Sequence, residues 1–490
     1  MGASGTGVVP VSPISANVHR LSTADPRIIA DMTTVARRTD RAAAPTMWRD
    51  GLAYVVAASV LVVLALWLHG GGIHQLLNAS RGDQLTAAGR LAGLLTADAM
   101  LVQVALMARI PWVEQSYGQD RLARWHRWLG FGSFTAMIVH IGLITLGYAS
   151  SARTGLLAQA WDLVWNYPGM LLAVAGVAAL VMVVVTSLRA ARRRLRYESW
   201  HLLHLYAYLG VGLALPHQVW TGSDFIGNAW ARAYWWTLYA AVAVNVLVFR
   251  VGLPLWRSWR HRLTVARVVP ESPGVVSVHL AGRKLDQLDV RAGQFFLWRF
   301  IDGPGSSRAH PFSLSASPSP DGLRITAKTL GEGSARLATL TPGTRVLVEG
   351  PYGRMTAAVR TQDRLTFIAA GIGITPMRAL LEELDYRPGE ATLIHRTSGS
   401  RDALLAHEIT ELARRRGVQV QHLPGPRDPH GGWLPVGLSA SRTTLHDLAP
   451  DIASSDVFLC GPEEWMRSVR DAARAAGVPD RQIHREHFAY

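Results

Sequence analysis

Four histidines lie inside apolar segments that are long enough to form helices. His126 and His140 share one segment, and His204 and His217 share another. On a helix axis, the members of each pair would be about 20 Å apart, which is most of a hydrocarbon core about 30 Å thick. Ionisable side chains are costly at membrane depth and usually have a partner there. Two haems with two histidine ligands each, at two depths, would provide partners for all four and would carry electrons across a membrane.

Six apolar stretches of spanning length are expected to form a transmembrane bundle that contains these histidines. They cover residues 48–68, 85–108, 125–148, 168–188, 200–220 and 234–255. Arginines concentrate in the connections after the second and fourth stretches, whereas the alternate connections carry only Arg81 and Arg153. Because positive residues favour the cytoplasmic side, both termini and everything after the sixth stretch are expected in the cytoplasm, next to the plasma membrane.

This orientation predicts how the histidines pair. His126 and His204 would lie at the cytoplasmic depth, and His140 and His217 at the outer depth. Fourteen steps along the third stretch return to within about 40° of the starting helix face, but thirteen steps along the fifth miss by about 140°. Pro216 must therefore kink or rewind that helix. His201, one turn before His204, is a rival ligand for the inner haem.

Composition limits the other possibilities. The chain has 490 residues, 49% of them hydrophobic, and a mean hydropathy of +0.14, so a purely soluble protein is excluded. The net charge of +15 comes from scattered arginines and is not interpreted as a nucleic-acid surface. The single cysteine, Cys460, excludes an intrachain disulfide and an all-cysteine iron–sulfur cluster. Residues 1–46 lack the apolar run of a secretion signal and are expected to be a disordered cytoplasmic tail.

The second half of the chain has a different pattern. Short β-branched and aromatic runs at 263–269, 275–280, 294–300, 324–329 and 345–349 predict an antiparallel β-barrel over residues 259–360. From 361 to 490, strands alternate with helices, which predicts a parallel α/β nucleotide-binding domain. The expected fold is thus a multidomain membrane protein, with a six-helix transmembrane bundle at 47–258 followed by these two domains.

Two motifs in the predicted barrel have the chemistry to hold a flavin nucleotide. Residues 308–315, RAHPFSLS, combine the cation of Arg308, the ring of Phe312 and the hydroxyl of Ser313. These groups suit an isoalloxazine ring that needs a donor near its redox nitrogen. Residues 329–334, TLGEGS, would offer backbone N–H groups and the Ser334 hydroxyl to a pyrophosphate, although a plain turn is the alternative.

Two further motifs belong to the predicted α/β domain. Residues 369–376, AAGIGITP, follow a strand and open a helix, which is the context of a nucleotide-phosphate loop. Gly371 and Gly373 permit a close backbone approach, and Pro376 can begin the helix. Residues 458–462, FLCGP, end a later strand at the same carboxyl edge, where open sheets bind ligands. A buried structural role is the alternative for Cys460.

Taken in order, HPFS, GxxS, GPYG at 350–353, GIGITP, CGP and a terminal aromatic residue resemble the ferredoxin–NADP reductase superfamily. With six helices and paired histidines in front, residues 48–490 are similar to the ferric reductase and NADPH oxidase family. The resemblance implies an FAD-binding barrel, an NAD(P)H-binding domain and two haem b groups held by the four histidines. It also implies that Ser313 lies near the flavin N5 and Arg308 near the pyrophosphate. The full set of implied flavin contacts is Arg308, His310, Pro311, Phe312, Ser313, Gly331 and Ser334.

The resemblance likewise implies a nicotinamide site and a cover for the flavin. The residues that match the nicotinamide-nucleotide positions are Gly371, Gly373, Thr375, Pro376, Cys460 and Gly461. Phe488 or Tyr490 would cover the flavin ring until nicotinamide displaces it. Arg396, with Arg401 nearby, follows the strand where a 2′-phosphate would lie, which favours NADPH over NADH.

These features predict a transmembrane oxidoreductase. Reduced nicotinamide would give a hydride to FAD, and single electrons would then pass through the two haems to an extracytoplasmic acceptor. No catalytic side-chain acid or base is needed. Ferric chelates and dioxygen both fit as acceptors, and no oligomeric state is predicted. A haem-free, membrane-anchored flavin reductase is one alternative, and an electron-delivery subunit for an extracytoplasmic reductase is another.

Overall fold

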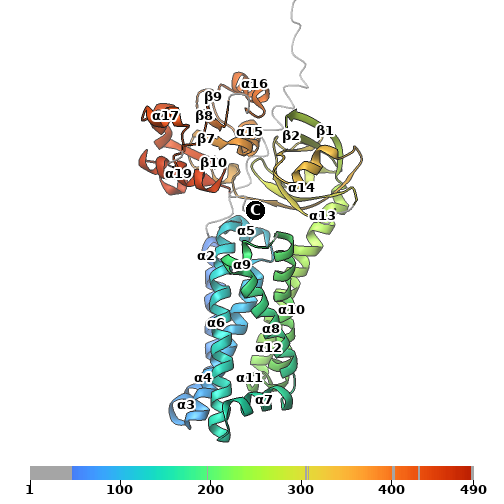
Figure 1. Ribbon diagram of the computed structural model, residues 1–490, viewed down its shortest axis with the longest axis vertical. Helices are drawn as coiled ribbons and strands as arrows, with labels where there is room; N and C mark the ends of the chain where they lie inside the picture. The colour runs from blue at the N-terminus through green and yellow to red at the C-terminus, as the bar shows by residue number, and fades with distance from the viewer. Residues whose placement is uncertain are drawn as a thin grey trace, which may run out of the picture. The chain divides into compact units, whose positions relative to one another are not determined.

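The computed structural model describes residues 47–195, 197–303, 306, 308–399, 403–428 and 431–486, all within one compact unit (Figure 1). The predicted tail, residues 1–46, lies outside the described residues. The described chain begins with helices, continues with a six-stranded antiparallel sheet and ends with a five-stranded parallel sheet. The predicted order of helical, antiparallel and parallel α/β parts is confirmed.

Several helices of the first part are long and apolar. Among the described residues, five segments are long and apolar enough to cross a membrane: Gly51–His69 of α2 (Met47–His69), α4 (Arg81–Leu106), α6 (Gln119–Ala152), α8 (Met170–Ser187) and Ala229–His261, which joins α12 (Ala229–Val246), a π-helical turn (Leu247–Gly252) and α13 (Leu253–His261). The 25-residue helix α10 (Tyr197–Thr221) is not among these five, so the six-helix count stays a prediction. Shorter helices connect them: α3 (Gly72–Asn78), α5 (Pro111–Tyr117), α7 (Leu156–Asn166), α9 (Arg189–Arg192) and α11 (Ser223–Ile226).

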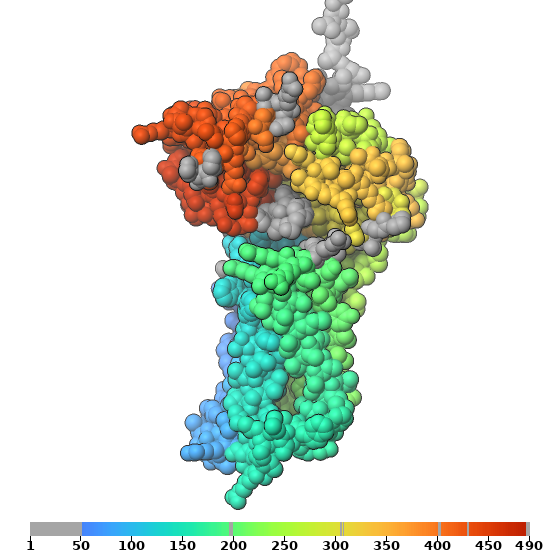
Figure 2. Space-filling view, viewed as in Figure 1, coloured from blue at the N-terminus to red at the C-terminus, as the bar shows by residue number. Residues whose placement is uncertain are grey.

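Small residues bring the long helices close together in pairs. Figure 1 shows α4 beside α6 and α8 beside α10. A Cβ atom on Gly82 would lie 2.9 Å from the carbonyl oxygen of Gly147, and one on Gly176 would lie 2.7 Å from that of Gly210. Only glycine permits such close helix packing. Large apolar side chains such as Trp128 remain exposed on the helices. Figure 2 shows one side of these helices, coloured from blue through cyan to green.

The antiparallel sheet has the strand order β4-β3-β6-β1-β2-β5. Its strands are β1 (Thr264–Ser272), β2 (Val275–Ala281), β3 (Phe295–Ile301), β4 (His310–Ser313), β5 (Leu323–Lys328) and β6 (Arg345–Tyr352), with α14 (Glu332–Ala335) after β5. Five strands confirm the predicted runs, whereas β4 was not predicted. Leu314, directly after β4, forms an isolated bridge with Ile325 of β5. This bridge joins the two edges of the sheet, and a closed barrel stays a prediction.

The parallel sheet has the order β11-β10-β7-β8-β9. Phe367 and Ile368 are neighbours on β7 but belong to different buried clusters, because side chains alternate between the two faces of a strand. Helices cover both faces, as in doubly wound folds. The elements are β7 (Arg364–Ala370), α15 (Ile374–Glu383), β8 (Ala391–Thr397), α16 (Ala406–Arg416), β9 (Gln419–Pro424), α17 (Val436–Ala440), α18 (Leu445–Leu448), β10 (Ser455–Cys460), α19 (Glu463–Ala475) and β11 (Ile483–Arg485). The prediction missed β9 and β11.

Candidate functional site

The four candidate haem ligands lie on two helices. His126 and His140 belong to α6, and His204 and His217 belong to α10. The imidazole rings of His126 and His204 have centroids 5.8 Å apart and planes 67° apart. His140 lies close enough to His217 for the two rings to interact electrostatically. The structure therefore forms the two expected pairs, while metal ligation by them stays a prediction.

Backbone carbonyls orient the two histidines of α6. Nδ1 of His126 lies 3.1 Å from the carbonyl oxygen of Gln103, and Nδ1 of His140 lies 2.8 Å from that of Gly89. A carbonyl oxygen only accepts, so both Nδ1 atoms carry the hydrogen and both Nε2 atoms keep a lone pair. This is the tautomer of a histidine that binds metal through Nε2. Both carbonyls belong to α4, and nothing in the sequence pattern pointed to them.

The histidines of α10 have different surroundings. Nδ1 of His204 lies 3.3 Å from the hydroxyl oxygen of Ser187, at the end of α8. Nδ1 of His217 is buried and has no hydrogen-bond partner among the described residues. Pro216 lies inside α10, which continues through it to Thr221. The backbone of His217 packs against Gly169, where a Cβ atom would lie 2.8 Å from the His217 nitrogen.

A haem with two histidine ligands fits the first pair. Two metal–imidazole bonds of about 2.0 Å place the ring centroids roughly 6 Å apart, and those of His126 and His204 are 5.8 Å apart. The rival ligand His201 instead has Arg250, Arg299 and Glu349 as its electrostatic neighbours. His204 is thus the residue whose ring approaches His126, and its role as the inner haem ligand stays a prediction.

The HPFS motif forms the edge strand β4. Ser313 is 7% exposed, and its hydroxyl oxygen has no hydrogen-bond partner among the described residues. Such a buried hydroxyl fits a site that a polar ligand atom completes. The indole of Trp298 donates to the carbonyl oxygen of Phe312 at 2.9 Å and so fixes the strand next to it. Arg308 lies at the exposed end of the motif, 3.6 Å from the carboxylate of Glu332.

The glycine loop after β5 contacts this motif. A Cβ atom on Gly333 would lie 2.2 Å from Cε1 of His310, so a larger residue here would push the imidazole aside. Pro311 pairs with Leu297 of β3. The Ser334 hydroxyl accepts from the backbone N–H groups of Leu330 at 2.9 Å and Gly331 at 3.2 Å. Ser334 therefore closes its own loop here, and a phosphate contact by Gly331 and Ser334 stays a prediction.

The nucleotide-loop motif and the CGP motif meet at the carboxyl ends of β7 and β10. Gly371 has a φ of 55°, and a Cβ atom on Gly373 would lie 2.3 Å from the carbonyl oxygen of Cys460. One on Gly461 would lie 3.1 Å from Cβ of Ala370. Glycines thus permit the close approach of the two motifs. At the start of α15, Thr375 donates to the carbonyl oxygen of Ile372 at 2.9 Å, and the adjoining Pro376 is buried.

Two buried groups define the chemistry of this edge. Burial raises the pKa of the Cys460 thiol to about 12, so the sulfur stays protonated at neutral pH. Burial lowers the pKa of His395 to about 4, and the neutral ring places Nε2 3.3 Å from the carbonyl oxygen of Gly371. The sequence analysis did not select His395, because its position predicted only a strand residue. In the structure, His395 lies on β8 and contacts the loop at Gly371.

Arg396 follows His395 at the end of β8. Its Nε is buried without a hydrogen-bond partner among the described residues, and its Nη2 donates to the carbonyl oxygen of Gly425 at 3.4 Å. Burial and the nearby charge of Arg427 both lower the pKa of Arg396. Two neighbouring guanidinium groups suit an anion such as a phosphate. Arg401 lies outside the described residues.

The carboxy-terminal aromatic residues Phe488 and Tyr490 lie outside the described residues. The described chain ends at Glu486, whose carboxylate accepts from the backbone N–H of Arg354 at 3.2 Å. A Cβ atom on Gly353, in the GPYG motif, would lie 3.2 Å from this carboxylate. Burial raises the pKa of Glu486 to about 7.

A charged cluster around the GPYG motif was not predicted. Arg109 lies 3.1 Å from Glu114, and its guanidinium lies 4.3 Å from the ring centroid of Tyr352. The Tyr352 hydroxyl donates to Glu349 at 2.9 Å. A cavity that is partly open to solvent lies among Arg109, Glu114, Arg257 and Tyr352.

Comparison with protein families assigns two parts of the chain. Residues 92–215 match the ferric reductase like transmembrane component, and residues 367–471 match the oxidoreductase NAD-binding domain. The chain combines a ferric reductase-like transmembrane domain with a reductase-type NAD-binding domain. The candidate haem ligands His126, His140 and His204 fall within the first match, and His217 lies just beyond it.

Several reductases are similar to the second half of the chain. The reductase subunit of stachydrine N-demethylase from Rhizobium meliloti is 29% identical over 226 residues, 45% of this chain and 64% of the relative. The ferredoxin reductase component of 3-ketosteroid-9-alpha-monooxygenase from Mycolicibacterium smegmatis is 32% identical over 236 residues, 46% of this chain and 65% of the relative. The chain thus spans just under two thirds of these relatives. The FAD/NAD-binding domain of a Vibrio cholerae nitric oxide dioxygenase is 25% identical, with a TM-score of 0.39, covering 46% of this chain and 98% of that one.

Proposed function

We propose that the protein passes electrons from cytoplasmic NAD(P)H, through FAD and two bis-histidine haems, to an acceptor on the other side of the plasma membrane. The observation that carries the proposal is the approach of His126 to His204, with His140 and His217 paired on the same two helices. The ferric reductase-like domain and the NAD-binding domain make the chain a transmembrane oxidoreductase, and the histidines give that activity a route through the lipid.

The protein's part is to hold and orient its cofactors. When bound, nicotinamide and flavin exchange a hydride, and flavin and haem iron carry single electrons. The four histidines would hold the haems through Nε2, with the carbonyls of Gln103 and Gly89 fixing Nδ1 on α6. No side-chain acid or base is required, because a hydride carries its own electron pair and the proton that reduced flavin would release on giving up its electrons would pass to water.

The soluble half offers sites for both nucleotides. The buried hydroxyl of Ser313 would hydrogen-bond a flavin ring nitrogen, and Arg308 would contact the flavin pyrophosphate. Gly371 and Gly373 would admit the phosphates of the nicotinamide nucleotide, beside the backbone of Cys460. Arg396 and Arg427 favour NADPH, because an arginine pair suits the additional 2′-phosphate.

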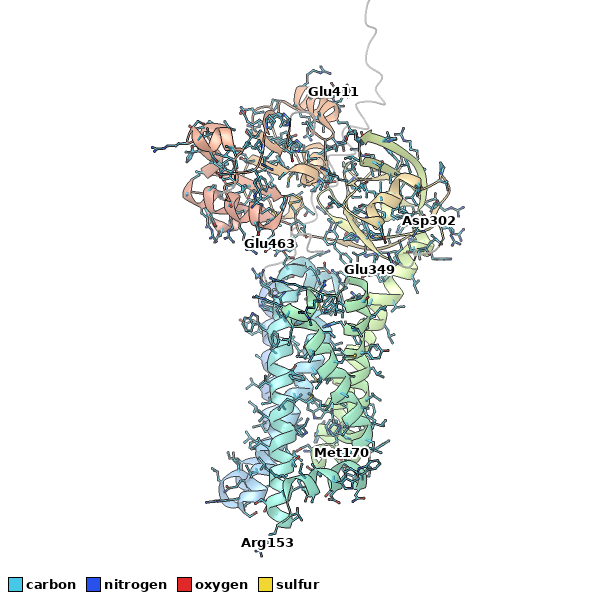
Figure 3. All side chains as sticks on the ribbon, viewed as in Figure 1. Arg153, Met170, Asp302, Glu349, Glu411 and Glu463 are labelled. Carbon is cyan, nitrogen blue, oxygen red and sulfur yellow. The ribbon has the colours of Figure 1, made fainter. Side chains whose placement is uncertain are left out.

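Arginine positions support the proposed orientation. Gly82 of α4 packs on Gly147 of α6, so Arg81 and Arg153 lie at the same end of the bundle. Figure 3 shows Arg153 and Met170 together at this end. The two arginines of α9 and those of the first turns of α6 lie at the opposite end, with His126 and His204. Positive residues favour the cytoplasm, so this opposite end would face NAD(P)H.

The acceptor would be a ferric chelate or dioxygen. The relatives that match just under half of the chain carry the names of reductase components for a demethylase and a monooxygenase, so they support electron delivery. A haem-free anchored flavin reductase and an electron-delivery subunit are the competing outcomes of the test below.

The test is anaerobic reduction of the purified full-length protein by NADPH. We expect a low-spin, six-coordinate haem spectrum and reduction of both haems after the flavin. Dioxygen or a ferric chelate is then added to the reduced protein. The acceptor is the one that reoxidises the haems faster, and its product is superoxide or ferrous iron. Protein that carries flavin but no haem would contradict the proposal in favour of the anchored reductase. Haem that is reduced but never reoxidised without a partner protein would favour the delivery subunit.

A further inference from the structure

Ser187 connects two side chains that surround one candidate haem ligand. It is the last residue of α8, whereas Trp200 and His204 lie one turn apart on α10. The indole Nε1–H of Trp200 donates to the Ser187 hydroxyl oxygen at 3.3 Å, and the same oxygen lies 3.3 Å from Nδ1 of His204. The indole also packs against the imidazole, with centroids 5.1 Å apart and planes 31° apart.

The donor chemistry of these groups determines where their hydrogens lie. An indole N–H only donates, so the Ser187 oxygen accepts from Trp200. An imidazole that binds metal through Nε2 carries its hydrogen on Nδ1, and this hydrogen would also point to Ser187. A hydroxyl oxygen has two lone pairs and can accept both. Ser187 therefore suits a His204 that is held as the Nδ1–H tautomer with Nε2 free for iron.

The two members of the pair are held by acceptors of different strength. His126 donates to the backbone carbonyl of Gln103, whereas the partner of His204 among the described residues is the hydroxyl oxygen of Ser187, which already accepts from an indole. The guanidinium of Arg192 lies 4.5 Å from the Trp200 ring centroid, so a positive charge lies on the His204 side. A weaker acceptor and a nearby cation both make an imidazole a poorer donor to ferric iron. Hydrogen bonds to axial ligands are a recognised means of tuning haem potentials.

We propose that Ser187 and Trp200 are positioning residues for His204 that hold its tautomer and ring plane and set the redox potential of the haem between His126 and His204. This inference rests on the proposed function, because it requires a haem at that pair. The haem between His126 and His204 would be the first electron acceptor in the membrane domain, and the Ser187 hydroxyl would adjust its redox potential.

The neighbouring residue provides a matched control. Thr186 also carries a hydroxyl near the end of α8, but it donates to the carbonyl oxygens of Met182 at 2.8 Å and Val183 at 3.1 Å within its own helix. Thr186→Ala thus removes a hydroxyl from the same helix turn without removing a contact to His204. Ser187→Thr keeps the hydroxyl and serves as the conservative rescue.

The experiment is a redox titration of the haem-loaded full-length variants, followed in the visible haem bands, together with low-spin EPR. Ser187→Ala should shift one of the two haem potentials to more positive values, because the imidazole loses an acceptor and stabilises ferric iron less. A tenfold change in the electron equilibrium between the haems corresponds to about 59 mV for one electron. Thr186→Ala should leave both potentials unchanged, and Ser187→Thr should restore the parent value. Trp200→Phe, which keeps a ring but loses the N–H, should alter the same haem.

The possible outcomes separate this inference from the function on which it rests. Haem-replete Ser187→Ala with unchanged potentials and an unchanged EPR spectrum overturns the inference alone. An equal shift in Thr186→Ala also overturns it, because the effect would then come from the helix end in general. Wild-type protein that binds no haem overturns the proposed function and this inference with it.

Discussion

His126 and His204 face each other from α6 and α10 with ring centroids 5.8 Å apart. The Nδ1 atom of each ring has a neighbour on a further helix. Gln103 of α4 is the neighbour for His126, and Ser187 of α8 is the neighbour for His204. Four helices therefore define the position of one imidazole pair. Because Nδ1 is engaged on both rings, the pair is arranged for a shared ligand at Nε2, as in metal sites whose outer contacts orient the ligands.

Replacing single histidines should remove single haems. His204→Ala takes away one of the two axial ligands at one depth, so we expect the protein to lose about half of its haem. His217→Ala should give the same loss at the other depth, and the double variant should contain none. The measurement is the ratio of haem to protein. His201→Ala is the matched control on α10, and its haem content should equal that of the parent. Loss of haem in this variant would show that His201 is a haem ligand and that the assignment to His204 is wrong.

Removal of the Ser313 hydroxyl should slow flavin reduction. Its oxygen is buried without a hydrogen-bond partner, which suits a contact to the flavin ring. Ser313→Ala should bind FAD normally but accept hydride from NADPH more slowly, on the order of tenfold to a hundredfold, because losing a hydrogen bond to a buried group costs about 1–3 kcal/mol. Stopped-flow bleaching of the flavin measures this rate. Ser319→Ala, which removes a hydroxyl from a turn in the same domain, should not change it. An unaltered rate in Ser313→Ala would rule out the contact.

Cys460 should remain a neutral thiol over the working pH range. Burial, with a smaller contribution from Glu486, raises the pKa of the thiol to about 12. A raised pKa means that the sulfur holds its proton until the medium is strongly alkaline, so no thiolate forms near neutral pH. The native protein should resist alkylation at about pH 8, and Cys460→Ala should leave the pH profile of NADPH oxidation unchanged. Rapid alkylation of the folded protein, or a lost step in that profile, would show a reactive thiol.

Asp456 should stabilise the nucleotide domain in a pH-dependent manner. Burial alone would raise the pKa of this carboxyl, but hydrogen bonds from His484 at 2.8 Å and from the backbone of Thr361 and Gln362 lower it overall. A lowered pKa gives stability that is fully present above the ordinary carboxyl pKa and is lost as the pH falls below it, through the lowered pKa of Asp456. Asp456→Asn should lower the free energy of unfolding by about 2–4 kcal/mol.

Thermal unfolding measures this effect, and an exposed aspartate provides the control. Asp451 pairs with Arg364 at the surface, where both side chains are largely exposed. Asp451→Asn should therefore change the free energy of unfolding by less than about 1 kcal/mol. If both variants unfold alike, or if Asp456→Asn keeps the acid-induced loss of stability of the parent, Asp456 does not have the role that its contacts indicate.

The sequence allowed the helix pairs to be predicted but not their rotation. The spacing of His126 and His140 places both on one face of a helix, and this face meets α10 in the structure. The choice between His201 and His204 depends on how α10 is turned about its axis, which no periodicity within one helix records. Ser187 was missed for a similar reason, since it reaches His204 from the end of a different helix.

In the second half of the chain, the order of the motifs predicted the fold better than strand patterns did. The strand β4 is short and follows a Gly-, Pro- and Ser-rich segment, so it carries too little periodicity to be recognised. Its place became clear only from pairing with β3. The contact between Gly373 and Cys460 was foreseeable, because both follow parallel strands at the same edge of the sheet. The support of the Gly371 loop by His395 was not, since it depends on side-chain direction across β8.

The ion pair of Arg109 and Glu114 should be strongly coupled. The two side chains are 13% and 6% exposed, and the second carboxylate oxygen of Glu114 is buried without a hydrogen-bond partner among the described residues. Arg109→Ala would leave this carboxylate in a poorly solvated site and remove the stack on Tyr352, so a loss of about 3–5 kcal/mol in the free energy of unfolding is expected. Adding Glu114→Gln should restore much of this loss, because the uncompensated charge disappears. Arg109→Lys should lie between the two, since it keeps the charge but not the planar stack. A double-mutant cycle in detergent, followed by thermal unfolding, measures the coupling; strictly additive losses would mean that the two residues act independently.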